Sequence, residues 1–209
     1  SLPRKSSSLS KDRYISEDFM EMEWNGIWAK TWLFAGIESD IKEIGDFFVY
    51  DIGRESIVIT RDESEKISAF YNVCQHRGNK IVTLESGSFN KVSCPYHGWS
   101  YALDGKLEHV PDRELFEGGV SCEEKSLKKV KVSVWAGLIF INMDENSSSL
   151  ETFLGPIIDQ LKPYKLEKMN LVQHQTVDDL ETNWKTVRDN FLEQYHVDFI
   201  HPQHASFVD

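Results

Sequence analysis

The sequence predicts an α+β protein, with an antiparallel all-β domain in the middle of the chain and a mixed helix-and-strand segment after it. Three observations carry this prediction. Short segments rich in β-branched and aromatic residues recur between about residues 40 and 145, separated by turn-forming residues. Two pairs of one cysteine and one histidine fall at loop positions of that region. After it, longer segments compatible with helices follow. We therefore divide the chain into a tail and helix (1–39), a β domain (40–145) and the start of a second domain (146–209).

Composition excludes several classes of protein. The chain has 209 residues and a net charge of -11, with 34 acidic residues against 23 basic ones and no long basic run. Nucleic acid and anionic membranes are therefore not expected partners. Three cysteines are too few for a disulfide-built secreted domain, and no apolar run approaches the ~20 residues that span a bilayer. No signal-peptide core precedes the first helix, so we expect a cytoplasmic protein.

The N-terminal region predicts one helix after a polar tail. Residues 1–12 are rich in serine and carry scattered basic residues. Ser16 can cap a helix, two acidic residues follow in its first turn, and apolar residues recur at helical spacing to about Lys30. The tryptophans of this region are expected in the core, namely Trp24, Trp28 and Trp32.

The middle of the chain predicts short strands joined by polar turns. Asp104-Gly105 is a two-residue signal for a β-hairpin between flanking apolar residues. The cysteine and histidine pairs should lie at loop tips. The predicted strands are Phe47–Ile52, Ser56–Arg61, Ile67–Tyr71, Val130–Trp135 and Gly137–Asn142.

The last third predicts a helix, a strand and a second helix. The first helix covers Leu150–Leu161 despite Pro156, the strand covers Asn170–Val177, and the second helix runs from Asn183 to about His196. No internal repeat is visible, and we expect the two cysteine and histidine loops to resemble each other only in the type of their ligands.

The first candidate site consists of Cys74 with His76 and Cys94 with His97. In structural zinc sites each half of the motif usually supplies one type of ligand. Here each half supplies one thiolate and one imidazole. A Rieske [2Fe-2S] cluster needs this set, because two cysteines hold one iron and two histidines hold the other.

The residues around these ligands resemble a known motif. Cys74-x-His76-Arg-Gly with Cys94-Pro-Tyr-His97-Gly-Trp resembles the Rieske motif of ring-hydroxylating and related Rieske non-haem iron oxygenases. Respiratory Rieske proteins carry an extra cysteine in each loop, which this chain lacks between residues 78 and 93. The resemblance implies an antiparallel all-β Rieske domain, followed by the first segment of an α+β catalytic domain of the helix-grip type.

The second candidate site lies in the last helical segment. Two histidines and a carboxylate on one side of a metal form the facial triad of non-haem Fe(II) oxygenases, but a His-x4-His spacing alone is a weak signal. His201 is rotated by roughly 140° from His196 on an ideal helix, so an unbroken helix would not converge them. Pro202 disfavours helical geometry at His201, and we expect the helix to end between the histidines.

The resemblance extends to this segment and assigns roles there. The family has an acidic residue, two residues, His, four residues and His, after an Asn-Trp-Lys stretch like residues 183–185. It implies that His196 and His201 bind mononuclear Fe(II) and that Glu193 links His196 to His97 of the partner subunit for electron transfer. The family's third iron ligand is a downstream Asp. Neither Asp198 nor Asp209 matches its position, so that ligand is expected beyond this sequence.

The family implies the oxygenase alpha component of a three-part system. An NAD(P)H-dependent reductase, with or without a ferredoxin, would supply electrons to a homotrimer or an α3β3 assembly. The iron would then activate O2 to hydroxylate or dihydroxylate an organic substrate. Aromatic substrates stand level with or slightly above amines on family frequency, although Glu193 resembles members that act on quaternary amines. Two other classes stay open: a non-catalytic Rieske electron carrier, which needs only residues 40–145, and a zinc-binding module.

Overall fold

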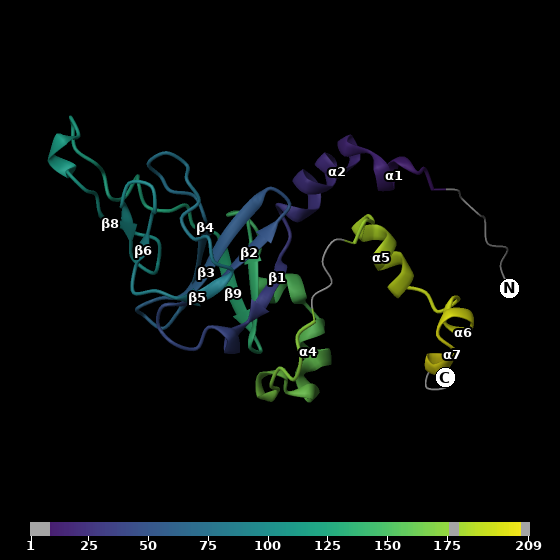
Figure 1. Cartoon of the computed structure of the whole chain (residues 1–209). Helices are drawn as coiled ribbons and strands as arrows, with labels where there is room; N and C mark the ends of the chain where they lie inside the picture. The colour runs from purple at the N-terminus through teal and green to yellow at the C-terminus, as the bar shows by residue number, and fades with distance from the viewer. Residues whose placement is uncertain (1–8, 176–179, 206–209) are drawn as a thin grey trace. The chain divides into compact units, whose positions relative to one another are not determined.

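The structure is a computed structural model and describes residues 9–175 and 180–205. The chain divides into two compact units, one formed by residues 27–170 and the other by residues 1–26 together with 171–209. The segments of the second unit are far apart in the sequence, and they are coloured purple and yellow in Figure 1.

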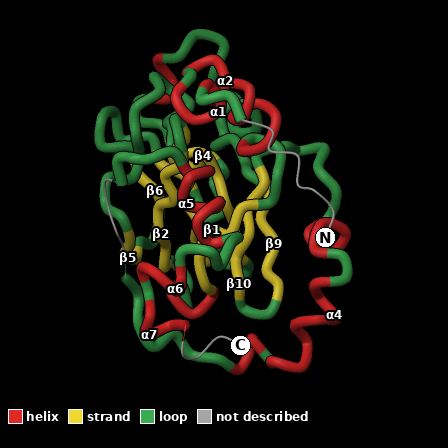
Figure 2. Tube along the Cα trace, turned by 90° about the vertical axis from the view of Figure 1, so that its right-hand side faces the viewer, coloured by secondary structure: helices red, strands yellow, loops and turns green. Residues whose placement is uncertain are grey.

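The larger unit contains three antiparallel sheets, drawn as yellow strands in Figure 2. The first has the strand order β4-β3-β2-β5. The second has the order β1-β10-β9, and the small third one the order β6-β7-β8. The strands are β1 (Leu33–Ile37), β2 (Asp46–Ile52), β3 (Glu55–Arg61), β4 (Ile67–Tyr71), β5 (Ser86–Ser88), β6 (Val92–Ser93), β7 (Ser100–Tyr101), β8 (Leu107–His109), β9 (Lys131–Trp135) and β10 (Leu138–Asn142).

The five predicted strands are confirmed as β2, β3, β4, β9 and β10. Strand β3 shows why these segments form strands. Ile57, Val58 and Ile59 are all fully buried, and successive side chains of a strand point to opposite faces. Val58 packs into the core that contains the candidate cysteines, whereas its two neighbours pack into the core beneath β10. The continuous apolar run therefore reflects a strand that is covered on both faces.

Strand β1 was not predicted, and it lies before residue 40. It pairs antiparallel with β10, with Leu33 opposite Ile141. The register shifts between Phe34 and Gly36, which marks a bulge. The segment is short and follows the N-terminal helix directly, so its pattern alone does not separate it from that helix.

The hairpin around Asp104 is confirmed, but its loop has three residues and not two. The backbone N–H of Ala102 donates to the carbonyl of Lys106 at 2.8 Å, and that of Gly105 donates to the carbonyl of Ala102 at 2.9 Å. Gly105 has a φ of 86°, in the left-handed region. A turn that ends in a left-handed glycine is the usual three-residue hairpin, and it joins β7 to β8.

The helix predicted over Leu150–Leu161 is two helices. Helix α3 (Leu150–Leu154) begins at Ser149, whose side chain accepts the N–H of Thr152, and α4 (Ile157–Leu161) begins after Pro156. Gly155 between them has a φ of 50°. Proline has no N–H and clashes with the preceding turn, so the helix breaks here. Short 3₁₀ turns lie at Glu38–Asp40, Arg113–Leu115, Lys162–Tyr164 and Leu166–Lys168.

The strand predicted over Asn170–Val177 is wrong for residues 170–175, which have no regular secondary structure; residues 176 and 177 lie outside the described residues. The segment has strand-like composition. A strand, however, is completed only by hydrogen bonds to a neighbouring strand, and no strand of the described part of the chain pairs with it.

The N-terminal helix is shorter than predicted and is followed by a different helical form. A turn, α1 (Asp12–Ile15), precedes α2 (Glu17–Glu23), and a π-helix covers Trp24–Trp28. Ser16 is the predicted cap, since its hydroxyl accepts the N–H of Phe19 at 3.3 Å. The three tryptophans occupy the predicted core positions: Trp24 and Trp32 are buried, and Trp28 packs against a buried cluster.

The last helix also ends earlier than predicted. Helix α5 (Trp184–Phe191) is capped by the side chain of Asn183, and α6 (Val197–Ile200) and α7 (Pro202–Ala205) follow. The Glu193 carboxylate accepts the backbone N–H groups of Tyr195 and His196. These bonds compete with continuation of the helix. Among the described helices, none is long and apolar enough to cross a membrane.

Candidate metal centres

The two cysteine and histidine loops have the same backbone conformation, contrary to the expectation that they share only their ligand types. The N–H of Gly78 donates to the carbonyl of Cys74 at 2.9 Å, and the N–H of Gly98 donates to that of Cys94 at 3.1 Å. Both glycines are left-handed, with φ values of 72° and 71°. The cysteine N–H groups close both loops, on Asn79 and Trp99.

The candidate cysteines are part of the hydrophobic core. Cys74 is 2% exposed and Cys94 is 3% exposed, and neither forms a disulfide. Burial raises the pKa of the Cys74 thiol, and its contact with Cys94 acts in the same direction. Two buried thiolates would repel each other and lack solvation, so only a bound cation can hold both in the ionised form.

The candidate histidines lie beside each other. The ring centres of His76 and His97 are 4.6 Å apart at an angle of 69°. The ring of His76 also stacks on Trp99, with ring centres 4.8 Å apart and planes within 4°. Burial lowers the pKa of His76, and the neighbouring His97 and Arg77 lower it further. His76 therefore stays neutral near pH 7, the form that binds a metal.

One atom of this site lacks a partner and points to the bound group. The Nδ1 atom of His76 is buried and has no hydrogen bond in the described part of the chain. A buried nitrogen without a partner costs free energy, and coordination to a metal removes that cost. With the two thiols, it fits the donor set of a cluster that takes two cysteines and two histidines.

The ligand set of this site can be compared with those of zinc and of a Rieske cluster. Across residues 9–175 and 180–205, no three His, Cys, Asp or Glu side chains are grouped so that they could hold one metal ion. A structural zinc ion would need four ligands around one point. The site supplies two thiols and two imidazoles, which is the donor set of a Rieske cluster, where each iron takes two protein ligands.

Two residues that the sequence did not reveal complete the surroundings. Tyr101 is fully buried, with its hydroxyl oxygen 3.3 Å from Cys74 Sγ and 3.2 Å from the N–H of Gln75. Phe116 and Trp99 help to line a cavity of about 320 Å³ beside the two histidines. Tyr101 stands in the hairpin after the second loop, so hairpin pairing was a usable signal for it. No signal in the sequence pointed to Phe116.

The second candidate site lies in residues 193–204. Glu193 Oε1 contacts His196 Nδ1, and the side chains are 44% and 22% exposed. The hydrogen bond from His196 lowers the pKa of Glu193. The carboxylate therefore stays ionised at neutral pH and fixes the orientation of the imidazole.

The predicted break before Pro202 is confirmed. His201 ends α6 with a φ of -128° and a ψ of 56°, outside the helical region. The ring centres of His196 and His201 are 5.6 Å apart. His204 adds a third ring, 5.3 Å from that of His201. The structure thus places Glu193 against His196, and the ring of His196 beside that of His201.

Comparison with known protein families finds two matching domain models. The family model for the Rieske [2Fe-2S] domain matches residues 31–129, and the model for the ring-hydroxylating alpha subunit (catalytic domain) matches residues 166–209.

Several characterised proteins are similar over almost the whole chain. The glycine betaine monooxygenase oxygenase subunit of Pseudomonas aeruginosa is 33% identical over 203 residues, which cover 95% of this chain and 46% of that protein. The carnitine monooxygenase oxygenase subunit of Escherichia coli is 32% identical over 210 residues, covering 99% and 54%. The anthranilate 1,2-dioxygenase large subunit of Acinetobacter baylyi is 30% identical over 208 residues, covering 96% and 44%. The chain thus spans about half the length of the curated relatives it matches.

Solved structures give the same result. A quaternary ammonium Rieske monooxygenase in complex with L-carnitine matches with a TM-score of 0.88 and 34% identity, over 95% of this chain and 56% of that one. Naphthalene 1,2-dioxygenase from Rhodococcus sp. matches with a TM-score of 0.80 and 29% identity, over 90% and 44%. The chain therefore belongs to the Rieske non-haem iron oxygenases and carries the Rieske [2Fe-2S] domain and a segment of the catalytic domain of an oxygenase alpha subunit.

Proposed function

We propose that this chain belongs to an oxygenase component that receives electrons at a [2Fe-2S] cluster and passes them to mononuclear iron for O2-dependent hydroxylation. The cluster ligands would be Cys74, His76, Cys94 and His97. The iron ligands would be His196 and His201. The observation that supports the proposal most directly is the pair of matching loops, which bring two buried thiols and two adjacent imidazoles together.

The loops would hold the cluster in a largely apolar environment. The cysteines would supply sulfur ligands from the core side, and the histidines would supply imidazole ligands from the surface side. Trp99 covers the face of His76 by stacking. When bound, the cluster supplies one-electron transfer and the mononuclear iron supplies the activation of O2.

Glu193 would orient His196 and carry electrons between subunits. One carboxylate oxygen contacts His196 Nδ1, and the other accepts two backbone N–H groups. A carboxylate has about four lone-pair sites, so it can also accept a hydrogen bond from His97 of the partner subunit. This role needs at least two copies, which supports a homotrimer or an α3β3 assembly. The third iron ligand would be a carboxylate outside residues 1–209.

We propose a quaternary ammonium compound as the substrate. The relatives named above that act on glycine betaine and carnitine are more similar to this chain than the anthranilate and naphthalene dioxygenases. This similarity favours a quaternary amine over an aromatic hydrocarbon as the substrate. Hydroxylation of an aromatic acid remains the second candidate, because the anthranilate enzyme is 30% identical.

The substrate is tested with the full-length protein and an NAD(P)H-dependent reductase, with and without a ferredoxin. O2 uptake is measured with glycine betaine, L-carnitine and gamma-butyrobetaine, and with anthranilate and naphthalene as controls. Uptake with a quaternary ammonium compound, together with an oxygenated product, supports the proposal. Coupled turnover of an aromatic substrate alone would contradict the substrate class.

Two variants test the sites. His196→Ala should abolish turnover and leave the visible spectrum of the cluster intact; unchanged turnover would remove His196 from the iron site. A non-catalytic electron carrier would show no turnover even in the unmodified protein. If the purified protein were colourless and contained stoichiometric zinc, the Rieske assignment would be wrong.

Glu193→Gln tests the transfer route. The variant should bind both metals and transfer electrons between them slowly in single turnover, because the amide accepts fewer hydrogen bonds and its NH2 group would oppose one imidazole N–H. A transfer rate equal to that of the unmodified protein would exclude the bridging role.

A further inference from the structure

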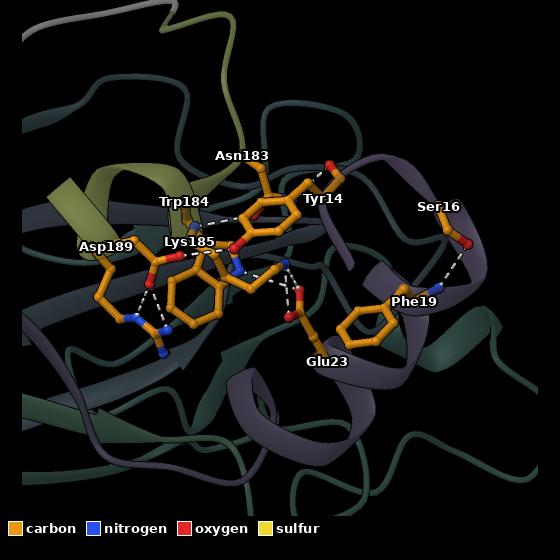
Figure 3. Close-up of polar contacts among 9 residues, drawn as sticks. Tyr14, Ser16, Phe19, Glu23, Asn183, Trp184, Lys185 and Asp189 are labelled. Carbon is orange, nitrogen blue, oxygen red and sulfur yellow. Dashed lines mark hydrogen bonds and ion pairs between the residues drawn. The ribbon is translucent and has the colours of Figure 1, made fainter. Parts of the chain in front are cut away.

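Residues 9–26 are called the N-terminal segment here. This segment contacts helix α5 through a buried ion pair (Figure 3). Lys185 Nζ lies 2.8 Å from Glu23 Oε1, and the two side chains are only 3% and 7% exposed. Trp184 Nε1 donates to the same carboxylate at 3.2 Å. The ammonium also lies over the rings of Tyr14 and Phe19, at 5.7 Å and 5.3 Å from their centres. This pair anchors the first turn of the helix.

A second contact anchors the last turn of the same helix. The hydroxyl of Tyr14 donates to Asp189 Oδ2 at 2.8 Å, as Figure 3 shows. The Asn183 amide also donates to the backbone carbonyl of Tyr14, at 3.1 Å. Arg188 holds the other oxygen of Asp189 at 2.7 Å. Hydrogen bonds from Arg188 and Tyr14 lower the pKa of Asp189, which is therefore ionised at neutral pH.

The two anchors lie on one face of α5. Lys185 and Asp189 are four residues apart, the spacing that places side chains above each other on a helix. One contact alone would leave the helix free to pivot around it, whereas two contacts one turn apart fix the direction of its axis. The N-terminal segment thereby determines where the C-terminal end of α5 points.

That end leads directly to the second metal centre. Asp189 lies in the last turn, and its carbonyl with that of Arg188 accepts the N–H of Leu192, the residue before Glu193. Glu193 in turn holds His196. A shift of the last turn is therefore passed along the backbone to the carboxylate and to the imidazole that it orients.

We infer that Tyr14 is a positioning residue of the second metal centre, acting through Asp189 on Glu193 and His196. The inference rests on the proposed function of those two residues. Tyr14 touches neither of the candidate iron ligands in the described part of the chain; its effect comes from the hydrogen bond to α5. The N-terminal segment would thus be needed for the catalytic site and not only for folding.

The test compares Tyr14→Phe with Ser16→Ala in the full-length protein. The phenylalanine keeps the ring over Lys185 and loses only the hydroxyl. Ser16→Ala is the matched control, because it also removes one hydrogen bond. That bond caps α2 and lies entirely within the N-terminal segment, so its loss does not remove a contact with α5. Amide exchange is measured in the iron-free protein for the peptide that contains Leu192 to His196. Loss of one hydrogen bond should make it exchange about fivefold faster in Tyr14→Phe, with no change in Ser16→Ala.

Electron transfer gives the functional readout. In single turnover with iron bound, Tyr14→Phe should transfer electrons from cluster to iron at least fivefold more slowly, whereas Ser16→Ala keeps the normal rate. A merely structural role would lower the melting temperature of both variants and leave both rates unchanged.

Asp189 variants show whether Tyr14 acts through this residue. Asp189→Asn keeps an oxygen that can accept the Tyr14 hydrogen bond, so its exchange should stay near that of the unmodified protein. Asp189→Ala removes the acceptor of the Tyr14 hydrogen bond and also the ion pair with Arg188, so exchange should be at least as fast as in Tyr14→Phe, and adding Tyr14→Phe to it should have no further effect. Additive effects would overturn the inference.

The result also separates this inference from the proposed function. If the unmodified protein transfers no electrons to iron, the proposed function fails, and the exchange data still decide whether Tyr14 positions this segment. If the unmodified protein transfers electrons but Tyr14→Phe behaves like Ser16→Ala in both measurements, the positioning role is wrong.

Discussion

Tyr101→Phe should lower the reduction potential of the Rieske cluster. Tyr101 is fully buried, and its hydroxyl oxygen lies 3.3 Å from Cys74 Sγ. Burial and the contact with Cys74 raise the pKa of the phenol, so it keeps its proton and can donate to a thiolate. Reduction adds negative charge to the cluster and its ligands. A donor at this distance therefore stabilises the reduced form more than the oxidised one.

The size of the effect follows from the strength of one hydrogen bond. A hydrogen bond to a charged group contributes roughly 1.5–3 kcal/mol, and only the part that grows on reduction changes the potential. If that part is about 1 kcal/mol, a one-electron couple shifts by about 40 mV, because a tenfold change in the equilibrium constant corresponds to about 59 mV. We therefore expect the potential of Tyr101→Phe to be about 40 mV lower.

The assay is a redox titration of the full-length protein, followed by the visible and EPR spectra of the cluster, with iron and sulfide content measured in each sample. Tyr96→Phe is the matched control: Tyr96 lies in the second cysteine and histidine loop, just before β7, but it is 60% exposed. Its potential should stay within about 10 mV of the unmodified value, since the exposed hydroxyl is already solvated by water. A potential of Tyr101→Phe equal to that of Tyr96→Phe, with full cluster content, would refute the reasoning.

Two further predictions concern stability. Glu23→Gln should destabilise the full-length protein by about 3–5 kcal/mol, because it leaves the Lys185 ammonium buried without its charged partner. The double variant Glu23→Gln with Lys185→Met should recover most of that loss, because it removes both charges. Urea denaturation followed by tryptophan fluorescence measures the free energy of unfolding of both variants. Lys80→Met, which removes an exposed ion pair, is the control and should change this free energy by less than about 1 kcal/mol. Equal losses in the single and the double variant would contradict a stabilising role of the Glu23–Lys185 charge pair. Gly105→Ala should lower the free energy of unfolding by more than about 1 kcal/mol, because φ is 86° and the new Cβ would lie 3.1 Å from the buried ring of Phe70. Gly26→Ala is the control: its new Cβ would meet nothing within 4 Å, so it should not lower the stability. The same denaturation measurement checks this pair, and equal stabilities would show that the hairpin does not need a left-handed residue.

Local signals in the sequence determined much of the fold. Composition and turn residues indicate a strand, and a capping side chain indicates the start of a helix. Strands β2, β3 and β4, the cap at Ser16 and the start of a helix at Asn183 were therefore predictable. The ligand types and spacing indicated the first candidate site for the same reason, whereas the second one was predicted from the family resemblance, because a His-x4-His spacing alone is a weak signal. Each half of the motif lies within a few residues of the chain.

The tertiary structure decided what depends on residues distant in the sequence. It showed that the loops at Cys74 and Cys94 share one backbone form and that residues 170–175 have no strand partner in the described part of the chain. It also placed Tyr101 against Cys74, Tyr14 against Asp189 and Glu23 against Lys185. The physical reason is that the residues around a single Glu, Lys or Tyr in the sequence do not indicate which distant residue it will contact. The chain must fold before charge, burial and hydrogen bonding select one.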